Sequence, residues 1–533
     1  MRLSTIAFTS LRRRKARPAK PFAVMVPDLD AARGLAHLTP EDEALLAGPR
    51  APIVLAPARP GALLAPSVSP GQDRVGLFLP YTPLHHLLFR RGGFRALVMT
   101  SGNRSDEPIV ASCEEAREKL TGVADLFLVH DRPILHRVDD SVVKPLGTRG
   151  PVVLRRARGY APAPLPLPNP QGRTVLAVGA ELANAVAVVR GPHVYLGPHF
   201  GDLKSLEVEE AFRDGIDHLL GLLGAAPDLV VCDRHPDYRS TRYAREWEAR
   251  GVEVVAVQHH EAHAAACMAE NGHRGRGVVL ALDGLGYGGD GTLWGGEILA
   301  GRPGSFRRAG HLVPVPQPGG DRAAREPWRM AASHLRRLRG PGWRTLPPFR
   351  ERSGEELDVL EAMLDRGFQS PLTSSCGRLF DAAAAILGFS GPLLYSAQAA
   401  MELEALAAAA PAGAEPYPFG DPPPREGALV LDPGPLLEAL LEDRLGGRDR
   451  VACAGAFHAG LAKLWALGAA EACRREGARD VFLTGGCVQN SVFVGHLARD
   501  LEALGLTPRL HREVPPNDGG IAYGQAAWAL GAG

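Results

Sequence analysis

The chain has no excess of charge of either sign. It carries 60 Lys and Arg residues against 59 Asp and Glu residues, a formal net charge of +1 at pH 7. No global electrostatic field therefore draws the protein to nucleic acid or to anionic lipid, and we expect neither as a partner. No apolar run approaches the roughly 20 residues that span a bilayer, so no membrane is expected either.

Paired cysteines are also missing. The seven cysteines are odd in number and form no C-x-x-C motif, which argues against a disulfide framework and against a zinc ribbon. This cysteine usage predicts a reduced, cytoplasmic compartment. The N-terminal MRLSTIAFTSLRRRKAR superficially resembles a transit peptide, but it runs straight into globular sequence.

A proline-rich stretch divides the chain into two blocks. The length of 533 residues predicts two to four domains, and APAPLPLPNPQ is typical of a stiff, extended linker. We therefore expect domains over 1–160 and 172–533, with a linker over 161–171. In the first block, the apolar runs APIVLA, VGLFLP, ALVMTSGN and ADLFLVH alternate with helical segments such as 114–120. This alternation predicts an α/β fold with buried strands.

The second block has the pattern of a two-lobed nucleotide-binding fold. Strands are predicted in TVLAVGAELANAVAVVRGPHVYLG, DLVVCD, VEVVAVQ and VVLALDGLG, with helices over 206–223 and around Tyr243. DVFLTGGCVQNSVFVGHLARDL reads as a strand, a Gly-Gly turn and a helix. Loops of this kind hold phosphate and ribose against backbone N–H groups. Two of them in one block suggest a cleft between two lobes.

The most informative motif is QHHEAHAAACMAENG, which places His259 and His263 four residues apart in a helix-forming run. Both imidazoles then project from one helix face and form half of a metal site, although this spacing also occurs by chance. Asp283 in ALDGLGYGG and Asp518 in PPNDGG add carboxylates that suit iron, manganese or zinc. The run is not a zincin H-E-x-x-H motif, because after His260-Glu261 the position that would need the second histidine is Ala264, so metalloprotease chemistry is not expected.

Two other features of the second block each have two possible interpretations. Asp381, in CGRLFDAAAAILG, either accepts from ribose hydroxyls or caps the alanine-rich helix that follows. The Gly485-Gly486 pair is either part of a nucleotide loop or a tight turn only.

The first block contains a basic cluster and a short polar loop. Lys15, Arg17 and Lys20 form either a triphosphate clamp or a solvated helix end. TSGNRSDEP supplies small hydroxyls and Asn103 around a glycine, a loop able to wrap a nucleotide. LRRARGY adds Arg155 to the candidate cations, whereas the acids of RVDDSVV are expected as turn caps.

Together these segments resemble the hydrogenase maturation carbamoyltransferase family, HypF, from Leu11 to about Leu530. The matching words are LRRRKARPAKPFAVM, LPYTPLHHLL, VMTSGNRSDEP, HDRPILHRVDDSVV, LRRARGYAP, VGAELANAVAVVRG, CDRHPDYRSTRYA, QHHEAHAAA, LDGLGYGGDGTLWGGE, SSCGRLFDAAAAILG, LTGGCVQN and PPNDGGIAYGQA. The resemblance implies a YrdC-like α/β domain that adenylates a carbamoyl group. It implies that an acetate kinase/Hsp70/actin-type domain similar to TsaD follows.

The resemblance also implies the site residues. Nucleotide-binding positions of the YrdC-like domain fall on Lys15, Arg17, Ser101, Asn103 and Arg155. The metal positions of the TsaD-like domain fall on His259, His263, Asp283 and Asp518, of which the first three are also implied as catalytic. Its ribose and adenine loops fall on Gly377, Asp381, Gly485, Gly486 and Asn490.

The family reaction then predicts the cofactors and partners. Carbamoyl phosphate yields carbamate, which attacks ATP, bound with Mg²⁺, to give carbamoyl adenylate and pyrophosphate. The carbamoyl group passes to the C-terminal cysteine of HypE, and the product is the precursor of the cyanide ligands of nickel–iron hydrogenase. A divalent metal (Fe, Mn or Zn) is expected in the TsaD-like domain.

The chain departs from the family at its N-terminal side. It has neither the acylphosphatase-like module nor the C-x-x-C zinc motifs of full-length members. MRLSTIAFTS fits no family segment, so the opening strand and helix of the YrdC-like domain are expected to be missing. These features predict a truncated chain, a misplaced start or half of a split gene, and an open sheet edge in that domain.

Three other functions stay open. An O-carbamoyltransferase acting on a small-molecule hydroxyl would place the two blocks in the reverse order. A fused pair for tRNA threonylcarbamoylation would carry a basic RNA-binding stripe. A nucleotide-binding partner of HypE that lacks adenylation activity is compatible with every motif of the second block.

Overall fold

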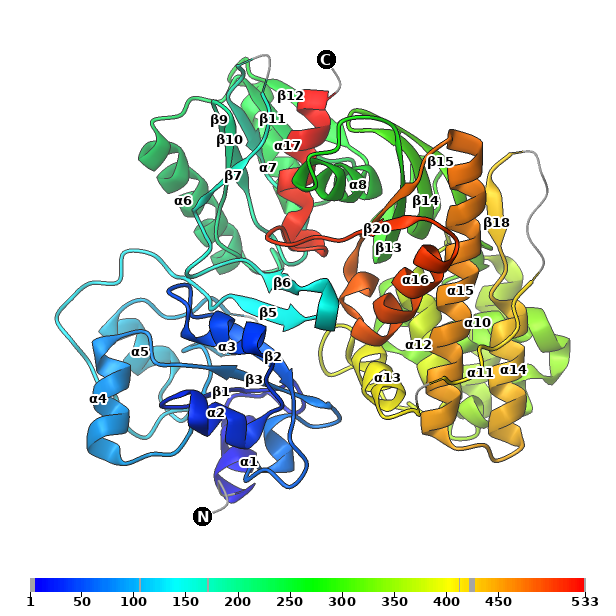
Figure 1. The fold of residues 1–533 in the computed structure, drawn as a ribbon, viewed down its shortest axis with the longest axis horizontal. Helices are drawn as coiled ribbons and strands as arrows, with labels where there is room; N and C mark the ends of the chain where they lie inside the picture. Colours follow the sequence, from blue (N-terminus) through cyan, green and yellow to red (C-terminus); the bar gives the residue numbers. More distant parts are fainter. Residues whose placement is uncertain (1–4, 105–106, 170–171, 412, 421–426, 532–533) are drawn as a thin grey trace. The chain divides into compact units, whose positions relative to one another are not determined.

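The computed structural model describes residues 5–104, 107–169, 172–411, 413–420 and 427–531 (Figure 1). Internal contacts divide the chain into two compact units. Unit 1 comprises Met1–Ala256 and Arg512–Ala526, and unit 2 comprises Val257–His511 and Ala527–Gly533. The domain limits expected from the sequence, 1–160, 161–171 and 172–533, remain a prediction.

Unit 1 opens with a six-stranded sheet in the order β4-β1-β3-β2-β5-β6. Its strands are β1 (Ala23–Met25), β2 (Ile53–Pro57), β3 (Arg74–Phe78), β4 (Leu97–Met99), β5 (Val142–Pro145) and β6 (Pro151–Arg155). Its helices are α1 (Thr5–Arg14), α2 (Leu29–Leu35), α3 (Pro40–Ala47), α4 (Pro83–Gly92) and α5 (Cys113–Lys119). Val54 and Leu77 are fully buried, so the buried strands predicted for APIVLA and VGLFLP are confirmed. ALVMTSGN also forms a strand, β4, but its residues are only partly buried.

Two predictions for this block are wrong. Thr5–Arg14 forms a helix, so an opening helix is present; Arg12 holds it by donating to the carbonyl oxygens of Ser67 (2.8 Å) and Val68 (3.2 Å). ADLFLVH forms no strand, and the side chains of Leu126 and Leu128 are 90% and 70% exposed. Its short apolar run favours a buried strand, but no strand in the described part of the chain pairs with it.

A second sheet of unit 1 has the order β12-β11-β8-β9-β10-β7. Its strands are β7 (Pro164–Pro166), β8 (Val175–Ala177), β9 (Ala187–Arg190), β10 (His193–Leu196), β11 (Leu229–Asp233) and β12 (Glu253–Val257). The helices α6 (Leu206–Leu223) and α7 (Arg239–Glu248) accompany it, and these elements confirm the predicted pattern. The proline-rich stretch is extended as predicted, yet β7 pairs with β10 as an edge strand, where proline is tolerated. Residues 170–171 of that stretch lie outside the described residues.

Unit 2 is built on a third sheet, in the order β16-β17-β14-β13-β19-β20, with β15 beside β14 and β18 beside β15. The strands are β13 (Gly277–Tyr287), β14 (Leu293–Arg302), β15 (Ser305–Leu312), β16 (Val315–Pro316), β17 (Leu372–Thr373), β18 (Leu429–Leu431), β19 (Asp480–Thr484) and β20 (Thr507–Arg509). β13 is longer than predicted because pairing with β14 resumes at Gly286, beyond an irregularity that follows Leu282. Asp283 therefore lies within an irregular strand rather than in a free loop.

Helices surround this sheet (Figure 1). They are α8 (His259–Glu270), α9 (Asp321–Arg325), α10 (Pro327–Arg339), α11 (Gly354–Arg366), α12 (Cys376–Ile386), α13 (Gln398–Ala408), α14 (Gly434–Leu445), α15 (Arg450–Glu476) and α16 (Ser491–Ala503), while α17 (Ile521–Gly531) crosses the unit boundary. Among the described helices, α15 alone is long and apolar enough to cross a membrane by length and composition. Its most apolar window is 78% buried inside the protein, as in a core helix.

Candidate functional site

The two histidines of the central motif lie on α8, one turn apart. Gln258 caps this helix by accepting a hydrogen bond from the Glu261 N–H at 2.9 Å, which fixes where the first turn begins. The Nε2 atoms of His259 and His263 lie 3.5 Å and 3.4 Å from Oδ2 of Asp283. All three side chains are buried. Both imidazoles face Oδ2 of Asp283, so the prediction that the four-residue spacing places them on one helix face is confirmed.

Asp283 is fixed from the opposite side by the glycine pair. The backbone N–H of Gly486 donates to Oδ1 of Asp283 at 2.9 Å. Gly485 has φ +94°, and a Cβ there would lie 2.2 Å from the carbonyl oxygen of Leu282. The Gly-Gly turn therefore does more than reverse the chain, because it carries a donor to the carboxylate. Burial acts to raise the pKa of Asp283, but hydrogen bonds from His259 and His263 outweigh it and hold that pKa well below its ordinary value.

The residues around Asp283 fit a divalent metal. The ligand atoms of His259, His263 and Asp283 lie within 4.8 Å of one another, and two imidazoles with a carboxylate are a donor set that iron, manganese and zinc accept. Asp518 begins a short 3-10 turn in the C-terminal segment that belongs to unit 1. Its role as a further ligand remains a prediction.

The start of α12 packs directly against the strand that carries Asp283. A Cβ on Gly377 would lie 2.9 Å from Cα of Gly284, and Ser375 donates from Oγ to the carbonyl oxygen of Asp283 at 3.2 Å. Ser375 also caps α12 by accepting from the Arg378 N–H at 3.1 Å. The helix therefore begins earlier than the sequence suggested. Asp381 lies inside it, so the capping interpretation of Asp381 is wrong.

Asp381 is buried and adjacent to one cation. Its carboxylate Oδ2 lies 3.0 Å from Nη1 of Arg378. Burial raises the pKa of Asp381 to about 6, and Arg378 offsets only part of that effect. A carboxylate of this kind accepts hydrogen bonds readily from ligand hydroxyl groups, which is consistent with the ribose interpretation.

Asn490 is held by two partners. Its Oδ1 accepts from the Phe493 N–H at 2.9 Å and caps α16, while its Nδ2 lies 2.9 Å from Nε2 of His458. His458 Nδ1 lies 2.8 Å from the carbonyl oxygen of Ala454, which can only accept, so this nitrogen carries the proton and Nε2 accepts from Asn490. Burial lowers the pKa of His458 to about 4, so the imidazole stays neutral at physiological pH.

A second cluster forms in unit 1. Lys15, at the end of α1, donates from Nζ to the carbonyl oxygen of Ser101 and to Oδ1 of Asn103 at 2.9 Å. The Ser101 hydroxyl also donates to Oδ1 of Asn103, at 2.8 Å. Three residues that the resemblance assigned to one nucleotide site are thus in direct contact. Burial, assisted by Arg17, lowers the pKa of Lys15 to about 8.

Further cations surround this contact. Burial lowers the pKa of Arg17 to about 10, with help from the neighbouring charges of Arg12 and Arg155. Arg155, at the end of β6, lies 3.6 Å from the carboxylate of Asp139. The acid thus faces a cation instead of only capping a turn. The cations of this cluster repel one another. A bound polyanion would relieve that repulsion, so the cluster favours polyanion binding.

Several residues of these sites were missed from the sequence. Arg378 follows Gly377 directly, and His458 stands in an apolar helix where nothing in the sequence marks it. Glu404 on α13 accepts from both the N–H (2.7 Å) and the hydroxyl (2.6 Å) of Ser491, next to Asn490. Only Arg378 had a sequence signal, its place inside the CGRLFD motif.

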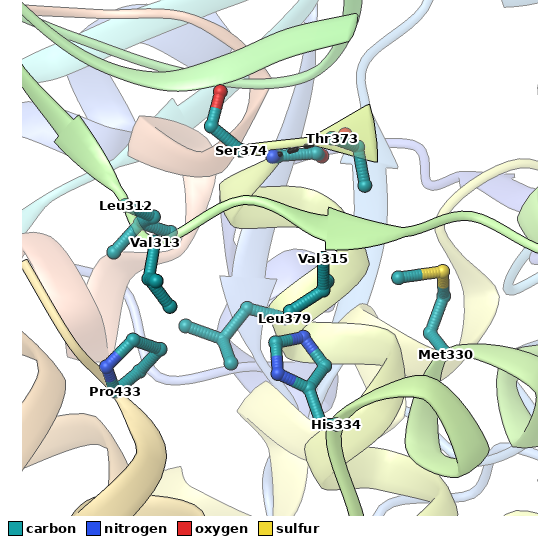
Figure 2. A pocket seen from close by; sticks show the side chains of 10 residues that line it. Leu312, Val313, Val315, Met330, His334, Thr373, Ser374, Leu379 and Pro433 are labelled. Atoms are coloured by element: carbon teal, nitrogen blue, oxygen red, sulfur yellow. Dashed lines mark hydrogen bonds between the residues drawn. The ribbon is translucent and has the colours of Figure 1, made fainter. Parts of the chain in front are cut away.

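A small cavity of about 10 Å³ lies elsewhere in unit 2 (Figure 2). That volume is about what one water molecule requires, and it is too small for a nucleotide. The cavity is lined by Leu312, Val313, Val315, Met330, His334, Thr373, Ser374, Ser375, Leu379 and Pro433.

Family models cover almost the whole chain. Residues 3–157 match the Sua5/YciO/YrdC model described as telomere recombination, so this match begins at residue 3 rather than at Leu11. Residues 170–270 match the HypF Kae1-like domain. Residues 279–525 match the second subdomain of the carbamoyltransferase Kae1-like domain. The fold and its sites thus define a carbamoyltransferase with a YrdC-like part followed by a Kae1-like (TsaD-like) part.

The individual proteins that the chain resembles identify the family. Carbamoyltransferase HypF of Rhizobium leguminosarum bv. viciae is 44% identical over 97% of this chain and 67% of its own length. Carbamoyltransferase HypF of Rhodobacter capsulatus has the same identity and the same two shares. Solved structures agree: full-length HypF in a phosphate- and nucleotide-bound form is 36% identical, with a TM-score of 0.93 over 99% of this chain and 82% of that chain. HypF of T. kodakarensis is 34% identical, with a TM-score of 0.92 over 99% and 70%.

The chain belongs to the HypF carbamoyltransferase family, and it spans about two thirds of the length of the two curated relatives. This membership gives it a HypF role in hydrogenase maturation.

Proposed function

We propose that the chain forms carbamoyl adenylate in unit 1 and transfers its carbamoyl group in unit 2 to the C-terminal cysteine of HypE. The observation that carries the proposal is the presence of two separate polar clusters, one cationic and one of imidazoles and a carboxylate. These are the two environments that adenylation and acyl transfer require. A HypF structure in a phosphate- and nucleotide-bound form supports nucleotide binding by this family.

In the first step, water hydrolyses carbamoyl phosphate to carbamate and inorganic phosphate. An oxygen of carbamate then attacks the α-phosphorus of ATP. The bond to the β-phosphate breaks and pyrophosphate leaves. Lys15, Arg17 and Arg155 would offset the negative charge on the polyphosphate, while Ser101 and Asn103 would orient the nucleotide. Mg²⁺ is proposed to accompany ATP, as it does at most polyphosphate sites.

In the second step, the HypE thiolate attacks the carbamoyl carbon, the bond from that carbon to the phosphate oxygen breaks, and AMP leaves. His259, His263 and Asp283, with Asp518, would hold a divalent iron, manganese or zinc ion. When bound, such an ion supplies Lewis-acid polarisation of the carbamoyl oxygen. The Gly486 N–H fixes the Asp283 carboxylate, and Gly377 allows α12 to approach the backbone of Asp283 and Gly284. Asp381 and the loop from Gly485 to Asn490 are proposed to bind the nucleoside.

Exchange of labelled pyrophosphate into ATP, dependent on carbamoyl phosphate, tests the first step on the purified chain without HypE. We expect exchange by the wild type and at least a tenfold slower rate for Arg155→Gln, because a fixed cation at the leaving group is lost. Arg13→Gln, on an exposed side chain of α1, is the matched control and should leave the rate unchanged.

Absence of exchange with carbamoyl phosphate and also with carbamate supplied directly, in a folded sample that still binds ATP, would contradict the adenylation step. The chain would then be a nucleotide-binding partner of HypE without adenylation activity. An equal loss in Arg13→Gln and Arg155→Gln would contradict the assignment of the cluster.

A further inference from the structure

Arg378 is a cation inside unit 2 whose hydrogen-bond donors are largely unused. Its side chain is 12% exposed, and the Nε and Nη1 nitrogens are buried with no hydrogen-bond acceptor among the described residues. Leaving such donors unmet costs about 1–3 kcal/mol each, and more for charged groups. Buried donors without acceptors are therefore expected at a place where a bound ligand accepts their hydrogen bonds.

The ion pair with Asp381 does not satisfy the guanidinium. The two charges approach to 3.0 Å, yet neither Nη1 of Arg378 nor Oδ2 of Asp381 has a hydrogen-bond partner of good geometry among the described residues. Arg378 therefore presents donors and Asp381 presents an acceptor side by side. A nucleoside phosphate offers the complement of both, with hydroxyl groups on the ribose and oxyanions on the phosphate.

The guanidinium also lies at the strand that carries the metal-ligand candidates. Its Nη2 is 4.0 Å from the position that a Cβ on Gly284 would take, one residue after Asp283. Gly284 has no side chain, so nothing from that residue stands between the strand and the guanidinium. A phosphate bound between this strand and α12 would need positive charge beside it, and Arg378 supplies a fixed cation there in addition to the divalent ion proposed for the Asp283 site.

We infer that Arg378 binds the phosphoryl group of the adenylate in unit 2, with Asp381 accepting from the ribose. The inference rests on the proposed function, in which an acyl adenylate enters unit 2. Arg378 would hold the phosphate oxygens while the bond from the carbamoyl carbon to the phosphate oxygen breaks, and would stabilise the charge that develops on departing AMP. The planar fork of arginine suits this better than lysine.

Photolabelling of the full chain with 8-azido-AMP and 8-azidoadenosine, followed by peptide mapping, tests the inference. Mapping reports on unit 2 peptides separately from unit 1, so binding at the Lys15 cluster does not interfere. For Arg378→Gln, we expect the 8-azido-AMP concentration for half-maximal labelling to rise at least tenfold relative to that for 8-azidoadenosine. Arg378→Lys should give an intermediate loss, and it serves as the second variant if Arg378→Gln does not fold.

Arg474→Gln, at an exposed arginine of α15, is the matched control and should leave the half-maximal concentration of both probes unchanged. An unchanged ratio of the two probes in a folded Arg378→Gln or Arg378→Lys variant would overturn the inference, as would wild-type labelling confined to unit 1. These outcomes are independent of the proposed adenylation. Pyrophosphate exchange can fail while the probe ratio holds, and the reverse can also occur.

Discussion

The backbone N–H of Gly486 donates to Oδ1 of Asp283 at 2.9 Å, joining residues that stand 203 positions apart in the sequence. The bond connects the irregular part of β13 to the turn after β19, and these two strands are parallel neighbours in the sheet. It leaves Oδ2 of Asp283 facing His259 and His263. One carboxylate thus links the candidate metal ligands to the candidate nucleotide loop.

The Gly485 position should not tolerate a side chain. With φ +94° and a prospective Cβ 2.2 Å from the Leu282 carbonyl oxygen, Gly485→Ala strains the turn. We expect it to lower the free energy of unfolding of unit 2 by about 1–3 kcal/mol or more, measured by urea denaturation. Gly495→Ala, in α16 with open space around its Cβ, is the control and should raise stability by about 0.5–1 kcal/mol. Equal effects of the two changes would refute this account of the turn.

Metal binding should depend on Asp283. Asp283→Asn removes the charged oxygen facing both imidazoles, so the divalent metal retained per chain after dialysis, measured by inductively coupled plasma mass spectrometry, should fall to near background. Asp290→Asn, on the exposed turn between β13 and β14, should retain the wild-type content. Unchanged metal in a folded Asp283→Asn protein would show that these residues do not hold the ion.

The buried Asp381 should make stability depend on pH. Burial raises its pKa in the folded state from 3.8 to about 6, so the folded state holds this proton more tightly than the unfolded state. The stabilisation from this group is present below pH 4 and is lost as the pH rises through 6. Asparagine stays neutral at every pH. The free energy of unfolding of Asp381→Asn should therefore rise relative to that of the wild type between pH 4 and 7, by up to about 3 kcal/mol for a shift of about two pKa units. A stability difference that is constant across this range would contradict the assignment.

His458 should act through Asn490. His458→Leu leaves the Asn490 amide without its buried acceptor, at a cost of about 1–3 kcal/mol in the free energy of unfolding. His458→Gln retains a side-chain oxygen that can accept the hydrogen bond from the Asn490 amide, so its free energy of unfolding should fall less than that of His458→Leu. The comparison by urea denaturation isolates the hydrogen bond from the volume change, and equal losses in the two variants would argue against it.

The helical elements of the second block were largely predictable because local signals define them. The predicted helix over 206–223 has the same limits as α6, which Ser205 caps. The α8 helix was predictable from alanine content, and the spacing of His259 and His263 placed both imidazoles on one face. Contacts between distant segments, such as Lys15 with Asn103, came only from the family resemblance, because spacing carries no information across 88 residues.

Other features followed from tertiary contacts that a single sequence does not reveal. Asp381 was placed ahead of its helix because the alanines that follow it dominate the pattern, whereas the cap is Ser375. ADLFLVH has a short apolar run like that of a buried strand, but a strand forms only where a partner strand is available. Arg378 was overlooked because only the folded structure shows that its donors lack acceptors.

The most direct test of the division of labour is a two-step assay of His263→Ala with HypE present. Pyrophosphate release is measured beside carbamoyl transfer to the HypE cysteine, with His37→Ala as an exposed control. We predict that His263→Ala abolishes transfer and spares pyrophosphate formation, while Arg155→Gln slows both steps. Equal loss of both steps in a folded His263→Ala protein would contradict the assignment of adenylation to unit 1 and transfer to unit 2.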